Sequence, residues 1–260
     1  MRSLLTISTC LLILFGNAQI QKIDNMPQEK ITVEVWSDVV CPFCYLGKKK
    51  LENAIKELEA EQLVEVIWKS FQLDPNFPKD TALPSAEYLS QRKGYPIDQV
   101  RAMSHHLANQ GLEYGIDFQF EKALTFNTFD AHRLIHWANE FHKSNELKQA
   151  FLIAYFTNGE NLSQAENLIK VVCSIGLDSE KAKAVLDSDK YAEEVRQDIY
   201  QAQQVGVRGV PFFLINNNQT ISGAQDDKVF VKALKAEMKK TKPLISSEYG
   251  AACAPDGKCD

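Results

Sequence analysis

The sequence lacks the features that mark several large classes of protein. Its 260 residues have a net charge of −5 and contain no long basic block, so a nucleic-acid partner is not expected. They contain no Pro- or Ser-rich low-complexity tract and no internal repeat. Beyond the N-terminus no apolar run approaches the roughly 20 residues that cross a bilayer. We therefore expect a compact, soluble body, with no stable membrane insertion after removal of the N-terminal segment.

The first residues have the pattern of a secretory signal. Arg2 gives a short positive start, residues 4–15 form an apolar run, and Gly16-Asn17-Ala18 is a small-residue cleavage site. We predict a signal peptide over residues 1–18 and an exported, periplasmic or extracytoplasmic protein. The alternative is a cytoplasmic protein whose translation starts at Met26, just before the first strand-like run.

Cysteines are few, at six in the chain, but their placement is informative. Export would remove Cys10 and leave five, so at least one thiol stays unpaired. Cys173 lies in the apolar helical segment "NLIKVVCSIGL". A cysteine in such a segment behaves most often as a small buried hydrophobe, and we expect Cys173 to be the unpaired one.

The order of elements predicts a βαβ unit, a long helical stretch and a closing ββα unit. Residues 31–36 alternate apolar and polar side chains as a strand does, residues 42–60 have helical spacing, and residues 63–71 form a second strand. The next strand signals come only in "GVPFFLINNNQTISG", two short runs around the turn Asn216 to Asn218, followed by a helix over 226–240.

Between these units nearly everything appears helical, with the clearest apolar face in "NTFDAHRLIHWANEF". Further helices are expected over 97–113, 146–156, 163–174 and 189–204. The domains that we predict are the signal at 1–18, one sheet-forming domain whose N-terminal part is 30–75 and whose C-terminal part is 206–242, a helical insertion at 76–205, and a cysteine-containing tail at 243–260.

The stretch "VEVWSDVVCPFCYLGKKK" carries the chemistry. Cys41 begins a helix directly after a strand, where unpaired N–H groups and the helix dipole stabilise a thiolate, and Cys44 lies one turn further on the same face. We expect a moderate activation of Cys41. The spacing of the pair alone also fits a zinc knuckle. Far downstream, "GVRGVPFF" places Pro211 at the start of a strand.

These motifs, together with "NTFDAHRLIHWA", resemble those of the DsbA-type thiol:disulfide oxidoreductases, specifically the FrnE-like branch, over nearly the whole chain after Glu29. The resemblance implies an α/β thioredoxin fold, with its N-terminal part at 30–75 and its C-terminal part at 206–242, and a large all-helical insertion after its βαβ unit. It implies that Cys41 is the exposed attacking cysteine, Cys44 the buried resolving one, and Pro211 a cis-proline. It further implies that the backbone at Val210 pairs with an extended substrate segment.

The predicted function is disulfide exchange with polypeptide thiols through the Cys-Pro-Phe-Cys motif. The expected partners are thiol- or disulfide-containing polypeptides and an unidentified redox partner, and neither a cofactor nor a metal is expected. Cys253 and Cys259 flank the turn sequence "APDGK" in the tail. They are either an auxiliary redox pair that relays electrons or a local staple.

Two other interpretations stay open, and the sequence argues against a third. Cys41, Cys44, Cys253 and Cys259 could form a four-sulfur zinc site in a structural protein. The chain could be a chaperone that carries a dithiol but exchanges no disulfides. Glutathione-dependent isomerases resemble the same fold, but they place a serine where Cys41 stands.

Two weaker features have patterns that favour a structural role. His132, His136 and Glu140 recur every four residues on one helix, as metal ligands sometimes do. Asp38, three residues before Cys41, could help to move a proton from the resolving thiol, or simply accept hydrogen bonds in a loop.

Overall fold

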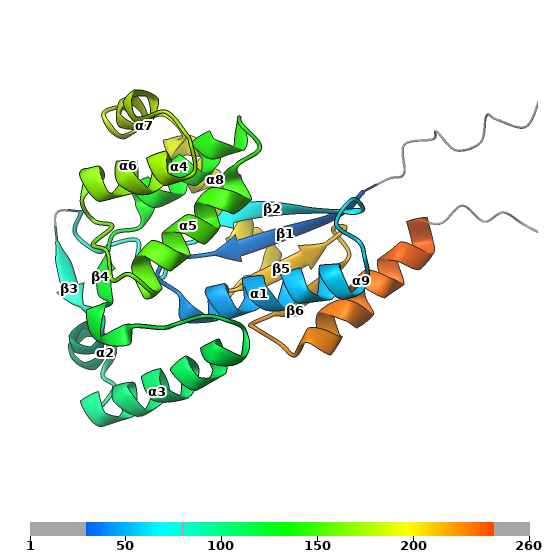
Figure 1. The fold of residues 1–260 in the computed structure, drawn as a ribbon, viewed down its shortest axis with the longest axis horizontal. Coiled ribbons are helices and arrows are strands. Elements are labelled where there is room, and N and C mark those ends of the chain that lie inside the picture. Colours follow the sequence, from blue (N-terminus) through cyan, green and yellow to red (C-terminus); the bar gives the residue numbers. More distant parts are fainter. Residues whose placement is uncertain (1–29, 80, 242–260) are drawn as a thin grey trace, which may run out of the picture.

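The computed structural model describes residues 30–79 and 81–241, and at its centre is a four-stranded mixed sheet (Figure 1). The strand order is β2-β1-β5-β6. The strands are β1 (Ile31–Ser37), β2 (Val64–Ser70), β5 (Phe212–Ile215) and β6 (Gln219–Ser222). β1 runs parallel to β2 and antiparallel to β5, so the first and last parts of the chain share one sheet.

Alternation along β1 sends side chains to two faces of the sheet. Val33 and Val35 belong to the main core. On this face lie α1 (Pro42–Glu57) and α9 (Asp227–Thr241), side by side in Figure 1. Trp36 points to the other face, where it packs with Ala202 of α8 (Ala192–Val205). Helices therefore cover both faces, and the apolar alternation of β1 follows from that burial.

The hairpin β5-β6 turns on asparagines, as the sequence predicts. Asn216 and Asn217 have φ of 47° and 53°, a left-handed conformation that asparagine tolerates and a tight hairpin turn requires. The Asn216 side chain also accepts a hydrogen bond of 2.9 Å from the backbone N–H of Thr32. The turn is thereby tied to the start of β1.

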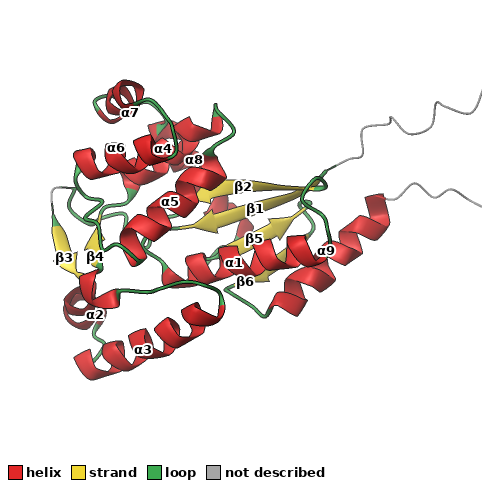
Figure 2. Cartoon of the chain, viewed as in Figure 1, coloured by secondary structure: helices red, strands yellow, loops and turns green. Residues whose placement is uncertain are grey.

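Between β2 and β5 the chain forms a mostly helical block, whose helices Figure 2 shows in red above the sheet and at its lower left. Its two strands, β3 (Ala82–Pro84) and β4 (Leu124–Phe126), pair as a small antiparallel ribbon. Its helices are α2 (Ser85–Lys93), α3 (Ile97–Glu113), the 3-10 turn η1 (Phe120–Lys122), α4 (Phe129–Asn139), α5 (Ser144–Phe156), α6 (Ala165–Ser174), α7 (Ser179–Leu186) and α8. The predicted architecture, βαβ, helical insertion, ββα, is confirmed.

Some boundaries differ from the prediction for local reasons. α6 begins two residues later than expected because the Asn161 side chain accepts hydrogen bonds from Ser163 and holds it in a turn. α8 begins at Ala192 because Tyr191 has φ of 61°, outside the helical region. The ribbon β3-β4 was not predicted, since strands of three residues are too short to show alternation.

Candidate functional site: a buried dithiol beside an apolar cavity

The dithiol forms at the junction of β1 and α1. Cys41 is the residue before the first helical position, with extended backbone angles, and Pro42 starts the helix where no N–H donor is needed. Cys44 follows in the first turn, and its backbone N–H donates to the Cys41 carbonyl at 3.0 Å. Both are free thiols in this structure. The sequence therefore places the pair as predicted, one turn apart at a helix start.

The expectation that Cys41 is exposed is wrong for this structure. Cys41 is only 4% exposed and Cys44 1%. The Cys41 thiol is covered by the loop before β5, where it donates to the Val210 carbonyl over 3.6 Å. Cys41 nevertheless lines a cavity that Cys44 does not reach. A substrate in this cavity would therefore contact the sulfur of Cys41 and not that of Cys44.

The loop at Val210 is held against α1 by close packing. The Val210–Pro211 peptide bond is cis, the geometry that the family resemblance implies. A Cβ on Gly47 of α1 would lie 2.9 Å from Cγ of Pro211 and 3.1 Å from the Phe213 ring. Glycine is therefore required at position 47 for the proline to pack beside the dithiol helix.

The charge of the reduced pair favours Cys44. Burial opposes ionisation of Cys44, but the hydrogen bond from Cys41, the Lys148 ammonium and the Ser37 hydroxyl together lower its pKa. The shared hydrogen bond with Cys44, followed by burial, raises the pKa of Cys41. In this closed arrangement the Cys41 thiol donates to the Val210 carbonyl, and the direction of its pKa is opposite to the activation that the helix start predicts, which stays a prediction for the open site.

Beneath the dithiol lies a buried polar cluster centred on Asp38. Its carboxylate accepts 2.8 Å hydrogen bonds from the backbone N–H groups of Val39 and Leu73 and lies 3.3 Å from Nε2 of His132. Burial opposes ionisation, yet His132 and the backbone donors lower the pKa of Asp38. Burial also lowers the pKa of His132, despite this partner. Asp38 thus makes the loop hydrogen bonds that the sequence suggested, and a proton-transfer role stays a prediction.

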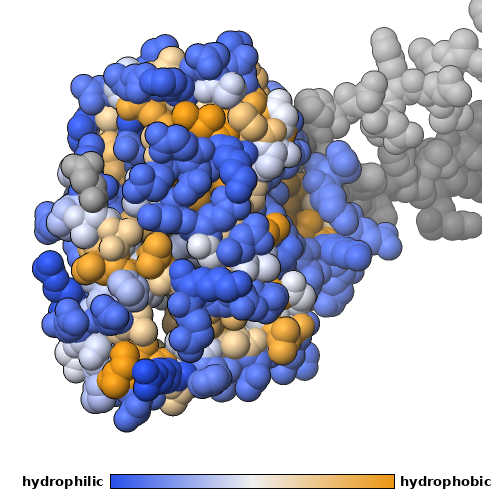
Figure 3. Space-filling model, turned by 60° about the vertical axis from the view of Figure 1, so that its left-hand side comes forward, coloured by the Kyte–Doolittle hydropathy of each residue, from blue (hydrophilic) through white to orange (hydrophobic). Residues whose placement is uncertain are grey.

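The cavity beside Cys41 has a volume of about 440 Å³ and reaches from the dithiol to α2 and α3. Its wall includes Phe43, Leu73, Tyr95 and Met103, each more than two-fifths exposed. Figure 3 shows such hydrophobic patches within an otherwise hydrophilic surface. Exposed large apolar side chains that gather around one cavity indicate a binding surface.

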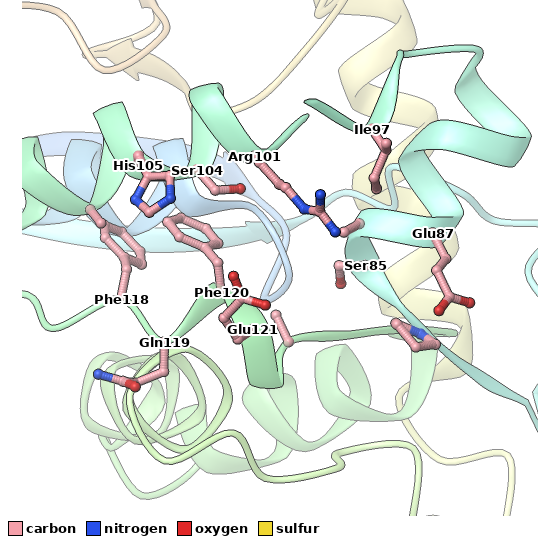
Figure 4. A pocket seen from close by; sticks show the side chains of 14 residues that line it. Ser85, Glu87, Ile97, Arg101, Ser104, His105, Phe118, Gln119, Phe120 and Glu121 are labelled. Atoms are coloured by element: carbon pink, nitrogen blue, oxygen red, sulfur yellow. The ribbon is translucent and has the colours of Figure 1, made fainter. Parts of the chain in front are cut away.

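A second cavity, of about 460 Å³, adjoins the first, and Ser85, Ser104 and Phe120 are among the residues that line both. Figure 4 shows Arg101 of α3 extending toward Ser85 at the start of α2. Charged side chains of both signs line this second cavity, and no cysteine does. The dithiol therefore borders the first cavity and not the second.

The other predicted residues fall into two groups. Cys173 is exposed, contrary to the prediction, because the buried face of α6 is formed by Leu168, Val171 and Val172. Cys253 and Cys259 lie outside the described residues, as does the signal, so the relay, the staple and the four-sulfur zinc site stay predictions.

His132, His136 and Glu140 each contact a residue of another element of the fold. His132 contacts Asp38, His136 lies 2.9 Å from Asp198 of α8, and Glu140 accepts from the Tyr191 hydroxyl. Within residues 30–79 and 81–241, no group of three His, Cys, Asp or Glu residues could hold a metal ion.

Sequence reasoning missed Lys148 and the four apolar residues at the cavity. A signal for Lys148 existed: Phe151, Leu152 and Tyr155 follow it at three, four and seven residues, all buried on α5, so this lysine occupies the apolar stripe. The cavity residues come from separate elements, and only the tertiary fold brings them together.

The comparisons with known proteins agree with this geometry. The family model of the DSBA-like thioredoxin domain matches residues 32–235. The chain belongs to this family. Its relatives include the uncharacterised protein YwbO of Bacillus subtilis, 30% identical over 214 residues, which cover 81% of this chain and 98% of YwbO.

Among solved structures, a probable DsbA oxidoreductase from Streptomyces coelicolor is 36% identical to this DSBA-like chain with a TM-score of 0.78, covering 87% of this chain and 97% of that one. A putative protein disulfide isomerase from Nitrosomonas europaea, at 18% identity and a TM-score of 0.63, covers 82% of this chain and 99% of its own, and shares the fold. The FrnE-like branch stays a prediction. In the described ranges, no helix combines the length and the apolar character that a membrane span needs.

Proposed function

We propose that this protein is a thiol:disulfide oxidoreductase that exchanges disulfides with polypeptides through Cys41 and Cys44. The observation that carries the proposal is the pair itself: two thiols one helical turn apart, of which only Cys41 borders a cavity. In the oxidising direction a substrate thiolate attacks Cys41 of the disulfide and forms a mixed disulfide. A second substrate thiol then displaces Cys41.

Polypeptides are the proposed substrates because the surface beside Cys41 is apolar. An unfolded chain presents apolar side chains next to its cysteines, and Phe43, Leu73, Tyr95 and Met103 offer contacts for them. The backbone at Val210 stands next to the sulfur and is the proposed pairing partner for an extended segment.

The decisive experiment combines two cysteine variants with a matched control. We expect Cys41→Ser to abolish exchange with a reduced, unfolded substrate, and Cys44→Ser to accumulate mixed disulfides through Cys41, visible on non-reducing gels. Cys173→Ser removes an exposed thiol far from this pair in sequence and should leave the exchange rate unchanged. Full exchange by Cys41→Ser would overturn the proposal, and substrate holding without exchange would favour a chaperone.

The reduction potential of the Cys41–Cys44 pair decides whether the protein oxidises or reduces its substrates. It is measured by equilibrating the protein in glutathione buffers and counting alkylated thiols by mass. A potential near about −120 to −180 mV marks an oxidase or isomerase, and one near about −270 mV a reductase. Two results together would favour the zinc site: the Cys41–Cys44 disulfide forms at no buffer ratio, and protein purified without chelators retains zinc.

We also propose export, on the pattern of residues 1–18. The protein recovered from its native cell should begin after Ala18 and lie outside the cytoplasm. A cytoplasmic protein that begins at Met26 would contradict this and would favour reduction.

A further inference from the structure

Three hydroxyl groups from the helical block form a chain in the wall of the cavity beside Cys41. Ser85 begins α2, Thr125 lies in β4 and Tyr155 in the last turn of α5, and all three line the cavity. The Thr125 hydroxyl donates to the Ser85 hydroxyl over 3.1 Å, and the Ser85 and Tyr155 oxygens are also 3.1 Å apart. The backbone N–H of Ser85 donates to the Ala123 carbonyl at 2.9 Å, which fixes the central residue of this hydroxyl chain.

The hydroxyl chain has one hydrogen atom more than it uses. Each of the three hydroxyls carries one hydrogen, and the two hydrogen bonds use two of them. Since Thr125 donates to Ser85, the third hydrogen belongs to Ser85 or to Tyr155, and neither hydroxyl has another partner among residues 30–79 and 81–241. Tyr155 is only 2% exposed, and burial raises the pKa of its phenol, so the group stays a hydrogen-bond donor. A buried donor without a partner is costly, so an acceptor that enters the cavity gains a hydrogen bond there.

The other polar groups of the cavity wall disfavour a negatively charged acceptor. Asp38 and Asp74 also line the cavity, and hydrogen bonds from other residues hold both carboxylates in place. A substrate carboxylate in the same cavity meets two charges of its own sign and loses its water in mostly apolar surroundings. The free hydrogen of the hydroxyl chain therefore suits an uncharged acceptor.

We propose that the free hydrogen of Ser85 and Tyr155 determines substrate specificity by binding an uncharged oxygen at the tip of an apolar side chain, such as that of tyrosine, in the substrate polypeptide. The inference rests on the proposed exchange function and names the class of substrate: a segment with such a side chain close to its cysteine. Phe120 and Phe156 line the same cavity and contact the apolar part of this side chain, while Cys41 meets the substrate sulfur. The cavity volume of about 440 Å³ lies within the ~300–1,000 Å³ of pockets that enclose a ligand group.

A preference for the oxygen separates this role from a purely apolar contact. A site that hydrogen-bonds a substrate oxygen discriminates against an analogue of the same shape without it, because the analogue leaves the buried donor unpaired. An apolar wall alone has no donor with which to make this distinction.

The test uses peptides with one cysteine and, at zero, one or two residues from it, either 4-methoxyphenylalanine or 4-ethylphenylalanine. These two side chains have nearly the same shape, but only the first has an oxygen acceptor. The exchange of each peptide with the oxidised full chain gives kcat and KM. The variant is Ser85→Ala/Tyr155→Phe, which removes both groups that can carry the free hydrogen. The matched control is Tyr114→Phe, which removes a hydroxyl that donates to Asp227 at 3.0 Å and lines neither cavity.

At the best-bound position we expect wild-type protein to have a kcat/KM about fivefold higher for the methoxy peptide, as one hydrogen bond supplies, with the difference in KM. Ser85→Ala/Tyr155→Phe should treat the two peptides alike while keeping the wild-type kcat/KM for the ethyl peptide. Tyr114→Phe should keep the fivefold preference. Urea unfolding of each variant reports stability separately.

Equal kcat/KM for the two peptides in wild-type protein would overturn the inference, and it is the result expected if the free hydrogen binds a backbone carbonyl or a water. An undiminished preference in Ser85→Ala/Tyr155→Phe, or an equal loss in Tyr114→Phe, would also overturn it. Should the double variant fail to fold, the two single variants decide, since each displaces the free hydrogen or breaks the hydroxyl chain that orients it and should lower the preference. A wild-type protein that exchanges with neither peptide nor with a reduced, unfolded protein would instead refute the proposed function, so the two failures are distinguishable.

Discussion

The two sulfurs of the dithiol face different surroundings, although they are one helical turn apart. Around Cys41 the neighbours are apolar and partly exposed, with Phe43 and Met103 at the rim of a cavity. Cys44 is buried, and the Lys148 ammonium and the Ser37 hydroxyl, both also buried, help to lower the pKa of its thiol. The comparison teaches that the two cysteines differ in access: Cys41 borders the cavity, whereas Cys44 is enclosed among buried polar groups that lower its pKa.

The largest effect is expected on the buried side, from Asp38→Ala. The change leaves the backbone N–H groups of Val39 and Leu73 without their acceptor and His132 without its partner, at a cost of about 3–5 kcal/mol in the free energy of unfolding. Urea denaturation measures this cost. Asp98→Asn, at a side chain that is 92% exposed, is the control and should change stability very little. Equal stability of the two variants would show that the cluster does not support the buried side.

Gly47→Ala tests the contact between α1, which carries the dithiol, and Pro211 in the loop before β5. Its Cβ would lie 2.9 Å from Pro211, so the loop before β5 must shift, at about 1–3 kcal/mol of stability and with slower exchange. At Gly209, in the same loop, a Cβ would meet nothing within 4 Å. Gly209→Ala should therefore keep wild-type stability in the same urea titration. An equally stable Gly47→Ala would mean that α1 and the loop adjust freely.

On the surface side, Met103→Ala should raise KM for an apolar, cysteine-containing peptide several-fold through the loss of about 1 kcal/mol of apolar contact. Its kcat, and its exchange with glutathione, should stay unchanged. Leu112→Ala removes a side chain of the same helix that is 65% exposed and does not line the cavity. A similar rise in KM for Leu112→Ala would contradict the assignment of the cavity to substrate binding.

The smallest effect concerns pH. The folded pKa of His132 is lowered below its ordinary value of 6.5, so the unfolded chain binds the proton more readily. Stability from this group is complete above a pH of about 6.5 and is lost as the pH falls toward the folded pKa. His132→Gln should flatten the fall of the urea midpoint between about pH 7 and pH 5. A wild-type slope in this variant would place the titrating group elsewhere.

The sequence predicts the thioredoxin-like part of the fold well because its signals are local. The alternation of β1, the helical spacing after Pro42 and the asparagine turn each lie within a few residues, and all three are found in the structure. The position of Cys41 and Cys44 follows from the same stretch.

What could not be predicted depends on contacts across the chain. The cover over Cys41 comes from Val210, and the charge beside Cys44 comes from Lys148 on a helix of the insertion. The burial of Cys41 and the lowered pKa of Cys44 are therefore properties of the assembled fold. A helix start by itself predicts the opposite distribution.

The register between β1 and β5 has a consequence for the helical block. Trp36 pairs with Phe212, so the sheet sets the reach from the Cys41 sulfur to the Val210 carbonyl, across a sequence separation of 169 residues. A slip of two residues would move the loop by about 7 Å, beyond the length of any such bond. The helical block between β2 and β5 can lengthen, shorten or change the residues that line its cavities without changing the distance from the Cys41 sulfur to the Val210 carbonyl. New substrate preferences can thus arise by remodelling the insertion while the spacing at the sulfur stays constant.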